Sequence, residues 1–265
     1  MEAVQQIGEK VLGGLSYVGS LAMLAGRSAY FTFIGPFTGK PVRAQRAVSQ
    51  AMEAGVRALP ILSLITFFIG LILALQAGYE MRRFGAMSYV ASAVALSMTR
   101  ELGPLITAVI VIGRSGSAFA AEIGTMKVTE EIDALETMAI SPVSFLVAPK
   151  FIAMILMLPC LTIWANFMGI LGGSLFGVWQ ADFTFARYIL ASLNALYLRD
   201  VTTGLAKSFM FGITITAVGC QEGFNTDGGA EQVGRSTTKA VVMSIFLVIL
   251  VDLIFTMLFF FLGGD

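Results

Sequence analysis

Five long apolar stretches dominate the sequence and leave few folds open to it. A membrane-spanning helix needs roughly 20 mostly apolar residues, and five segments meet that need: 58–79, 84–113, 151–181, 201–221 and 240–264. Of all residues, 57% are hydrophobic and 13% are charged, whereas a soluble domain has about 25% charged residues. We therefore expect the all-α class: a polytopic membrane protein of about five transmembrane helices, forming a single domain over residues 1–265.

The distribution of lysine and arginine predicts the orientation of these spans. Cytoplasmic segments of membrane proteins carry an excess of both residues. With the N-terminus inside, segments 1–57, 114–150 and 222–239 are cytoplasmic, and they hold eleven of these cations against four on the outer side. The outer pair Arg82-Arg83 runs against this rule. A first span that is re-entrant, or tilted so that both arginines reach lipid head groups, would remove the conflict.

Two weaker segments are expected to lie along the membrane surface. Residues 5–37 contain Lys10 and Arg27 and place apolar residues at intervals of three from Leu12 to Leu21. This pattern favours an interfacial helix on the inner leaflet, with a sixth span as the alternative. Residues 182–200 have the pattern of a short amphipathic helix on the outer face.

Charged residues also lie inside the spans. Arg100 and Glu101 interrupt the second span, and Lys207 and Asp252 lie within the fourth and fifth. A charge at the centre of a spanning helix costs roughly 2.5–3.5 kcal/mol on insertion scales, so such residues usually face a partner or a cavity. Pro104 should kink the helix next to the first pair. Two interpretations stay open: the charges pair for structural reasons, or they face a substrate.

The segment Glu122–Ser141 is the only sizeable polar helix that the sequence predicts. Its apolar residues recur at multiples of three, which places them on one helical face that ends at Pro142. A solvated loop helix would show this pattern. So would a docking helix whose apolar ridge enters a groove of a partner protein. The ridge consists of Ile123, Met126, Ile132, Leu135 and Met138.

Three glycines in the third span predict a close helix contact. Gly169, Gly173 and Gly177 are spaced by four residues, which is typical of a small-residue packing face between membrane helices. The spacing fits a contact within the chain and a contact across a dimer equally well.

Residue content excludes several chemistries. There is no histidine, and Lys plus Arg and Asp plus Glu both number 17, which excludes histidine-based sites and the basic balance of a nucleic-acid binder. Cys160 and Cys220 lie in separate apolar stretches and are expected to be small core residues. The run Gly113–Ala118 lacks the Walker A pattern. We expect no catalytic residue, metal or cofactor.

The sequence closely resembles the MlaE family of ABC-type lipid permeases from about Gly26 onward. The run Arg100–Pro142 carries the strongest similarity. The matching motifs are Arg100-Glu101-Leu102-Gly103-Pro104, Gly113-Arg114-Ser115-Gly116-Ser117-Ala118, Ala121-Glu122-Ile123-Gly124, Gly172-Gly173-Ser174-Leu175, Ile213-Thr214-Ile215-Thr216 and Thr237-Thr238-Lys239-Ala240-Val241-Val242.

This resemblance implies a phospholipid transporter with several subunits. Such permeases are homodimers in the inner membrane of a diderm bacterium, or in a plastid inner envelope. Each subunit binds a cytoplasmic ABC ATPase through a coupling helix, here 122–141. An MCE-domain protein lies on the periplasmic side, and many systems add a STAS-domain protein. The transporter moves phospholipid between the inner and outer membranes and so maintains lipid asymmetry.

The resemblance also assigns residues to two sites. It maps the polar lining of the lipid cavity onto Glu101 and Lys207, beside Arg100, and the apolar lining near Leu73, Gln76 and Phe84. The residues it assigns to ATPase coupling are Glu122, Ile123, Met126, Glu130, Leu135 and Met138.

Two other classes of function compete with this interpretation. An intramembrane lipid hydrolase or acyltransferase would need a nucleophile beside a base, and neither is evident in a chain without histidine. An ion-coupled secondary transporter could use Glu101, Asp252 and Lys207 as a proton relay. It would need no partner protein, so copurification of an ATPase would argue against it.

Overall fold

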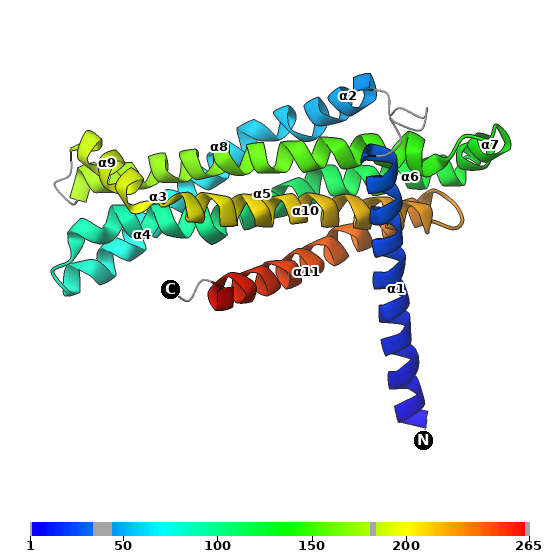
Figure 1. Ribbon diagram of the computed structural model, residues 1–265, viewed down its shortest axis with the longest axis horizontal. Coiled ribbons are helices and arrows are strands. Elements are labelled where there is room, and N and C mark those ends of the chain that lie inside the picture. Colours follow the sequence, from blue (N-terminus) through cyan, green and yellow to red (C-terminus); the bar gives the residue numbers. More distant parts are fainter. Residues whose placement is uncertain (1, 34–43, 181–183, 263–265) are drawn as a thin grey trace. The chain divides into compact units, whose positions relative to one another are not determined.

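The computed structural model describes residues 2–33, 44–180 and 184–262, and all regular elements in these ranges are helices (Figure 1). Five of them are long and apolar enough to span a membrane: Gln45–Arg83, Met87–Val128, Val143–Trp179, Leu198–Phe224 and Ala230–Phe261. Each contains most of one predicted span. The predicted class, an all-α polytopic membrane protein with five spans, is confirmed.

The helices follow one another with short connections. The α-helices are α1 (Glu2–Phe33), α2 (Ala44–Ala54), α3 (Leu59–Arg83), α4 (Val90–Ser97), α5 (Gly103–Val111), α6 (Ser117–Val128), α7 (Glu131–Thr137), α8 (Ala148–Gln180), α9 (Phe185–Ala195), α10 (Leu198–Phe224) and α11 (Ala230–Leu262). Helix α1 covers most of the predicted interfacial segment and is not among the five candidate spans. Helix α9 lies within the segment predicted to be amphipathic. The ends of the predicted segments at 34–37, 181–183 and 263–264 fall outside the described residues.

The second span is helical throughout but changes its winding twice. A π-helix at Met98–Leu102 separates α4 from α5, and a second one at Ile112–Gly116 separates α5 from α6. The first ends at Leu102, two residues before Pro104, which has no N–H to donate to the preceding turn. The N–H of Gly103 bonds instead to the carbonyl of Met98. The helix therefore accommodates Pro104 through wider winding, which is a recognised cause of bends.

The predicted helix 122–141 is in fact two helices. Helix α6 ends at Val128, and α7 begins at Glu131. Between them Glu130 adopts a left-handed conformation with φ 60°, which no regular α-helix can contain. The expectation of one continuous apolar ridge along this segment is therefore wrong. A change of direction after Val128 separates Ile123 and Met126 from the apolar residues of α7.

The chain packs as two compact units. Unit 1 contains the described parts of Met1–Ala51, Ser115–Met154 and Ile213–Ser244, and unit 2 those of Met52–Arg114, Ile155–Gly212 and Ile245–Asp265. Most of the residues in the segments predicted to be cytoplasmic belong to unit 1. The outer-side cations Arg82, Arg83, Arg187 and Arg199 all belong to unit 2. Two cations of the segments predicted to be cytoplasmic, Arg57 and Arg114, belong to unit 2 as well.

Glycines permit the close helix contacts of unit 2. A side chain at Gly169 would meet Met98, and one at Gly173 or Gly177 would meet Tyr188 of α9. The small-residue face of α8 thus packs within the chain. Tyr188 is fully buried, and this burial raises the pKa of its phenol, which keeps it neutral.

Helices α3 and α8 approach so closely at Gly70 that a Cβ atom there would overlap the backbone of Gly169. We expect Gly70→Ala to destabilise the protein by about 1–3 kcal/mol, because a backbone cannot yield as a flexible side chain can. The measurement is the midpoint of thermal unfolding in detergent. Gly113→Ala is the control, since its Cβ would meet no atom within 4 Å. Equal midpoints for both variants would contradict the proposed contact.

Candidate functional site

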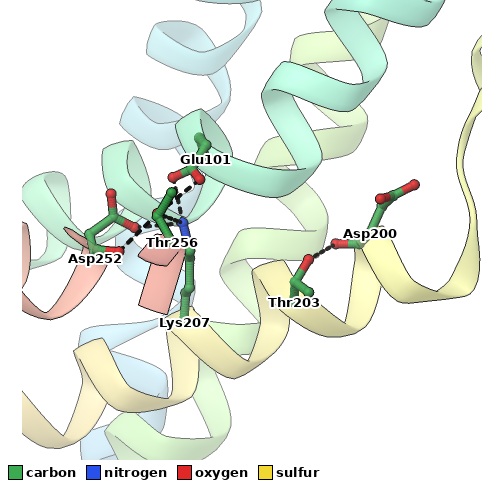
Figure 2. A network of polar contacts seen from close by, with 6 residues as sticks. All are labelled: Glu101, Asp200, Thr203, Lys207, Asp252 and Thr256. Atoms are coloured by element: carbon green, nitrogen blue, oxygen red, sulfur yellow. Dashed lines mark hydrogen bonds and ion pairs between the residues drawn. The ribbon is translucent and has the colours of Figure 1, made fainter. Parts of the chain in front are cut away.

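A buried lysine binds two acidic residues within unit 2 (Figure 2). Lys207 of α10 has only 2% of its side chain exposed. Its Nζ atom donates to Oε2 of Glu101 at 2.5 Å and to the hydroxyl of Thr256 at 2.8 Å. Oδ1 of Asp252 lies 3.0 Å from the same nitrogen. Three mid-span charges that the sequence singled out therefore form one network, which joins the first π-helix, α10 and α11.

Local backbone features bring this network together. Gly204 lies three residues before Lys207, and a Cβ atom at Gly204 would overlap the carbonyl of Thr99. Helix α10 can therefore approach the π-helix only because residue 204 has no side chain. The π-helix inserts extra winding just at Arg100 and Glu101. This winding gives Glu101 its position beside Lys207, and π-helical turns of this kind are frequent at functional sites.

Thr256 connects Lys207 with the carboxylate of Glu101 and with the backbone of Asp252. Its hydroxyl oxygen accepts the hydrogen bond from Lys207 and lies 3.1 Å from Oε1 of Glu101 and 2.9 Å from the backbone carbonyl of Asp252. A hydroxyl has one proton, so it donates to one of these two acceptors at a time. The network therefore holds one cation between two acids. A buried lysine is tolerated in apolar surroundings only with such compensation.

A second ion pair lies next to the first and was not predicted. Asp200 has 2% of its side chain exposed, and its Oδ1 accepts from Nε of Arg100 at 2.6 Å. Its Oδ2 accepts from the backbone N–H of Tyr197 at 2.9 Å. The sequence analysis placed Asp200 in the outer amphipathic segment 182–200 and assigned it no role. The one signal for this role in the sequence is the position of Asp200 in the first turn of a helix. An acid there can bind backbone N–H groups that have no partner within the helix.

A cavity of about 590 Å³ opens on both ion pairs. Its polar wall carries three cations (Arg100, Arg199 and Lys207) with Glu101 and Asp200. Its apolar wall is aromatic, since Phe259, Phe260 and Phe261 of α11 lie there. Arg199 and the aromatic triplet were also missed. A cavity with cations at one side and aromatic rings at the other suits an amphipathic ligand with an anionic head group.

The structure separates the other residues assigned to the lipid cavity from this one. Leu73 is half-buried and packs against the cluster around Ala74 and Val94. Gln76 is exposed, and Phe84 has 80% of its surface exposed at the end of α3. The described residues that line the cavity include Arg100, Glu101 and Lys207. They do not include Leu73, Gln76 or Phe84.

The residues assigned to ATPase coupling lie in unit 1 and differ greatly in exposure. Ile123, Ile132 and Leu135 are buried, and Met126 is half-buried. Ile123 packs against Gly223 of α10, so closely that a Cβ atom at Gly223 would overlap the Ile123 side chain. Only Met138, with 61% exposed, presents a large apolar surface, and Glu130 is exposed. The prediction of an exposed five-residue ridge is thus wrong, because most of its members serve the core of unit 1.

Glu122 also has a partner within the chain. Its Oε2 lies 2.6 Å from Nζ of Lys150, which is 1% exposed.

Of the two cysteines, Cys220 is buried as expected, whereas Cys160 is exposed on the surface of α8. The described part of the chain contains no group of three or more histidine, cysteine or acidic residues arranged to hold a metal ion.

Comparison with known proteins assigns this architecture. Residues 47–258 match the family described as Permease MlaE. The chain belongs to the MlaE permease family. It is 36% identical to a probable ABC transporter permease protein of Rickettsia felis over 98% of both chains. It is 35% identical to the intermembrane phospholipid transport system permease protein MlaE of Haemophilus influenzae, over 89% of this chain and 91% of that one.

A plant protein is also similar to this chain. The chloroplastic protein TRIGALACTOSYLDIACYLGLYCEROL 1 of Arabidopsis thaliana is 34% identical over 83% of this chain and 63% of its own length. Membership of the family and five candidate spans together make the present chain a multi-pass membrane permease.

Proposed function

We propose that this chain is the transmembrane permease subunit of an ABC transporter that moves phospholipid between the inner and outer membranes of a diderm bacterium. The observation that carries this proposal is the cavity of unit 2, where buried Lys207 and the aromatic residues of α11 line one space. A phospholipid has an anionic phosphate and apolar chains, and these two walls match its two parts.

Lys207 is the residue that we assign to the lipid phosphate. In the structure Glu101, Asp252 and Thr256 hold its ammonium group. We assign to Glu101 the task of holding Lys207 until a lipid arrives. With 40% of its side chain exposed, Glu101 can rehydrate when the phosphate takes its place. Asp252 is less exposed at 17% and would stay as the fixed partner that keeps the lysine compensated.

The proposed assembly is a homodimer of this chain with a cytoplasmic ABC ATPase and a periplasmic MCE-domain protein, joined in some systems by a STAS-domain protein. Its location would be the bacterial inner membrane, with the N-terminus inside. The relative from Haemophilus influenzae supports this proposal, since its name places it in an intermembrane phospholipid transport system. The excess of lysine and arginine in segments 1–57, 114–150 and 222–239 supports the orientation.

ATP should be hydrolysed by the partner and not by this chain. The sequence has no Walker A loop to bind the phosphates of ATP. We expect the purified permease to show no ATP turnover above a blank, and the complex purified through a tag on the permease to show robust turnover. The control is a complex whose ATPase subunit lacks its phosphate-loop lysine. Turnover by the permease alone, free of any contaminating ATPase, would contradict the ABC assignment.

The charge network also favours a second candidate. Two carboxylates and an ammonium group within hydrogen-bonding reach could relay protons in an ion-coupled secondary transporter. Such a transporter would run on an ion gradient and would need no ATPase. Transport that collapses when the proton gradient is dissipated, while ATP is maintained, would support it over the ABC mechanism.

A further inference from the structure

Unit 1 contains a second charged cavity, which the proposed transport site does not include. It has a volume of about 200 Å³, well above the roughly 10–15 Å³ that one ordered water needs. Helix α2 contributes three polar residues, and α6, the π-helix Val143–Val147 and the beginning of α8 contribute the others. The lining residues are Arg46, Ser49, Gln50, Glu122, Phe145, Leu146, Pro149 and Lys150.

The charge of this cavity favours an anion. Arg46 and Lys150 contribute two positive charges, and Glu122 contributes one negative charge. Lys150 is 1% exposed, pairs with Glu122, and has its ammonium group 4.9 Å from the centre of the Phe119 ring. One carboxylate thus neutralises the buried lysine and leaves Arg46 uncompensated among the lining residues. A partly desolvated cavity with a net positive charge attracts an anion more strongly than the same charge does when water surrounds it.

The donors of the cavity are positioned for a phosphate ester. The guanidinium carbon of Arg46 lies 3.7 Å from the centre of the Phe145 ring, which fixes the planar group by stacking. Ser49 and Gln50 lie one turn further along α2 and also line the cavity. Within the described ranges their side chains make no hydrogen bond. Their hydroxyl and amide groups are therefore available to a ligand. They lie beside the guanidinium group of Arg46, whose paired N–H donors suit phosphate oxygens.

Helix α2 has the features of a helix at the membrane surface. Helix α3 alone has 25 residues, or about 38 Å at 1.5 Å per residue, which exceeds the hydrocarbon core of about 30 Å. Gly55 and a 3₁₀ helix at Val56–Ala58 separate α2 from α3, so α2 is not needed to cross the membrane. On α2 itself Val48 and Met52, four residues apart on one face, are 62% and 56% exposed. Exposed apolar residues next to a polar face are typical of a helix that contacts lipid.

From these observations we infer that the cavity of Arg46 and Lys150 binds the phosphate ester of an anionic phospholipid in the cytoplasmic leaflet. The bound lipid is a resident of this site and not the transported cargo. Its phosphate lies between Arg46, Ser49 and Gln50, and its chains follow the apolar face of α2. The same donors would suit free phosphate, so the experiment separates the two sources.

The test uses the full-length permease, with the subunits that copurify, in nanodiscs of phosphatidylcholine. A trace of phosphatidylglycerol carries a photoreactive group at its head. After illumination, mass spectrometry measures labelling of peptides that cover residues 44–54 and 143–150. We expect both peptides to be labelled, and Arg46→Gln to reduce their labelling about tenfold, which corresponds to the loss of one charge-assisted hydrogen bond.

Arg235→Gln is the matched control. Arg235 belongs to the same unit but pairs with Glu231 on an exposed helix turn, so its loss should leave labelling of both peptides unchanged. Ser49→Leu is a second variant, at an exposed position where folding is not at risk, and it should reduce labelling by obstructing the cavity. Wild-type labelling in Arg46→Gln or Ser49→Leu would overturn the inference. Labelling that millimolar inorganic phosphate abolishes would assign the cavity to free phosphate and would overturn the lipid assignment.

Discussion

Replacing Lys207 by methionine is expected to reduce ATP-driven lipid transfer at least about tenfold, since it removes the charge that we assign to the lipid phosphate. Complex assembly should stay near the wild-type yield. Glu101 is 40% exposed on the cavity side and can be hydrated when its partner is lost. Lipid transfer between reconstituted vesicles and the yield of purified complex are the two measurements.

The double variant Glu101→Gln with Lys207→Met separates this role from a structural one. If the network only stabilised the fold, Lys207→Met would leave Glu101 and Asp252 without their cation and cost roughly 3–5 kcal/mol, whereas Glu101→Gln would leave Lys207 paired with Asp252. The double variant removes one of these two unpaired acids, so it would then recover part of the assembly and transport that Lys207→Met loses. Our account expects the double variant to assemble and still fail to transport. Lys207→Arg keeps the charge and should retain part of the activity.

Replacing Met138 by aspartate is expected to weaken binding of the ATPase at least about tenfold, as loss of a central apolar contact does at protein interfaces. Met138 is the one member of the assigned apolar group that is exposed. The measurement is the amount of ATPase retained by the tagged permease after washing. Met138→Leu keeps the apolar surface and is the control. Wild-type retention in Met138→Asp would show that the ATPase docks elsewhere.

Leu135 is not suitable for the same experiment. It is 7% exposed, so an aspartate there would be buried without a partner and would destabilise unit 1. Loss of the ATPase from such a variant would report damage to the fold. The distinction matters because the sequence pattern alone places Leu135 and Met138 on one apolar face.

The sequence predicted the spans well because each property needed for a span is local. Length, apolar content and the placement of Lys207, Glu101 and Asp252 at mid-span can all be read without knowledge of packing. The opposite signs and similar depth of Glu101 and Lys207 predicted that they could compensate each other, and their contact is confirmed. Asp252 was recognised as a mid-span acid, and the structure places it on the same lysine.

Other features depend on contacts that no local pattern reports. The sequence assigned no partner to Asp200, and only the folded chain shows that Arg100 and the N–H of Tyr197 bind it. Glu130 ends a helix in a conformation that glycine or asparagine would normally signal. Gly204 stood outside the spaced glycines of the third span, although its contact with Thr99 sets the position of Lys207.

The cavity lining shows the limit of transferring residues by family resemblance. One cavity is lined by Arg100, Glu101 and Lys207. The sequence distinguishes each of these residues by a family motif or by its charge within a span. Leu73, Gln76 and Phe84 were placed by local alignment without a motif of their own, and in the structure they lie away from that cavity. Their role in lipid binding remains a proposal without support from the geometry.

The most direct test of the central claim is transfer of a fluorescent phospholipid between two vesicle populations by the reconstituted complex. One population contains the permease with its ATPase, and the partner MCE-domain protein is supplied between them. We predict transfer that requires ATP, persists when the proton gradient is dissipated, and stops when the ATPase subunit lacks its phosphate-loop lysine. Transfer that continues without ATP and collapses with the proton gradient would contradict the account and identify an ion-coupled transporter instead.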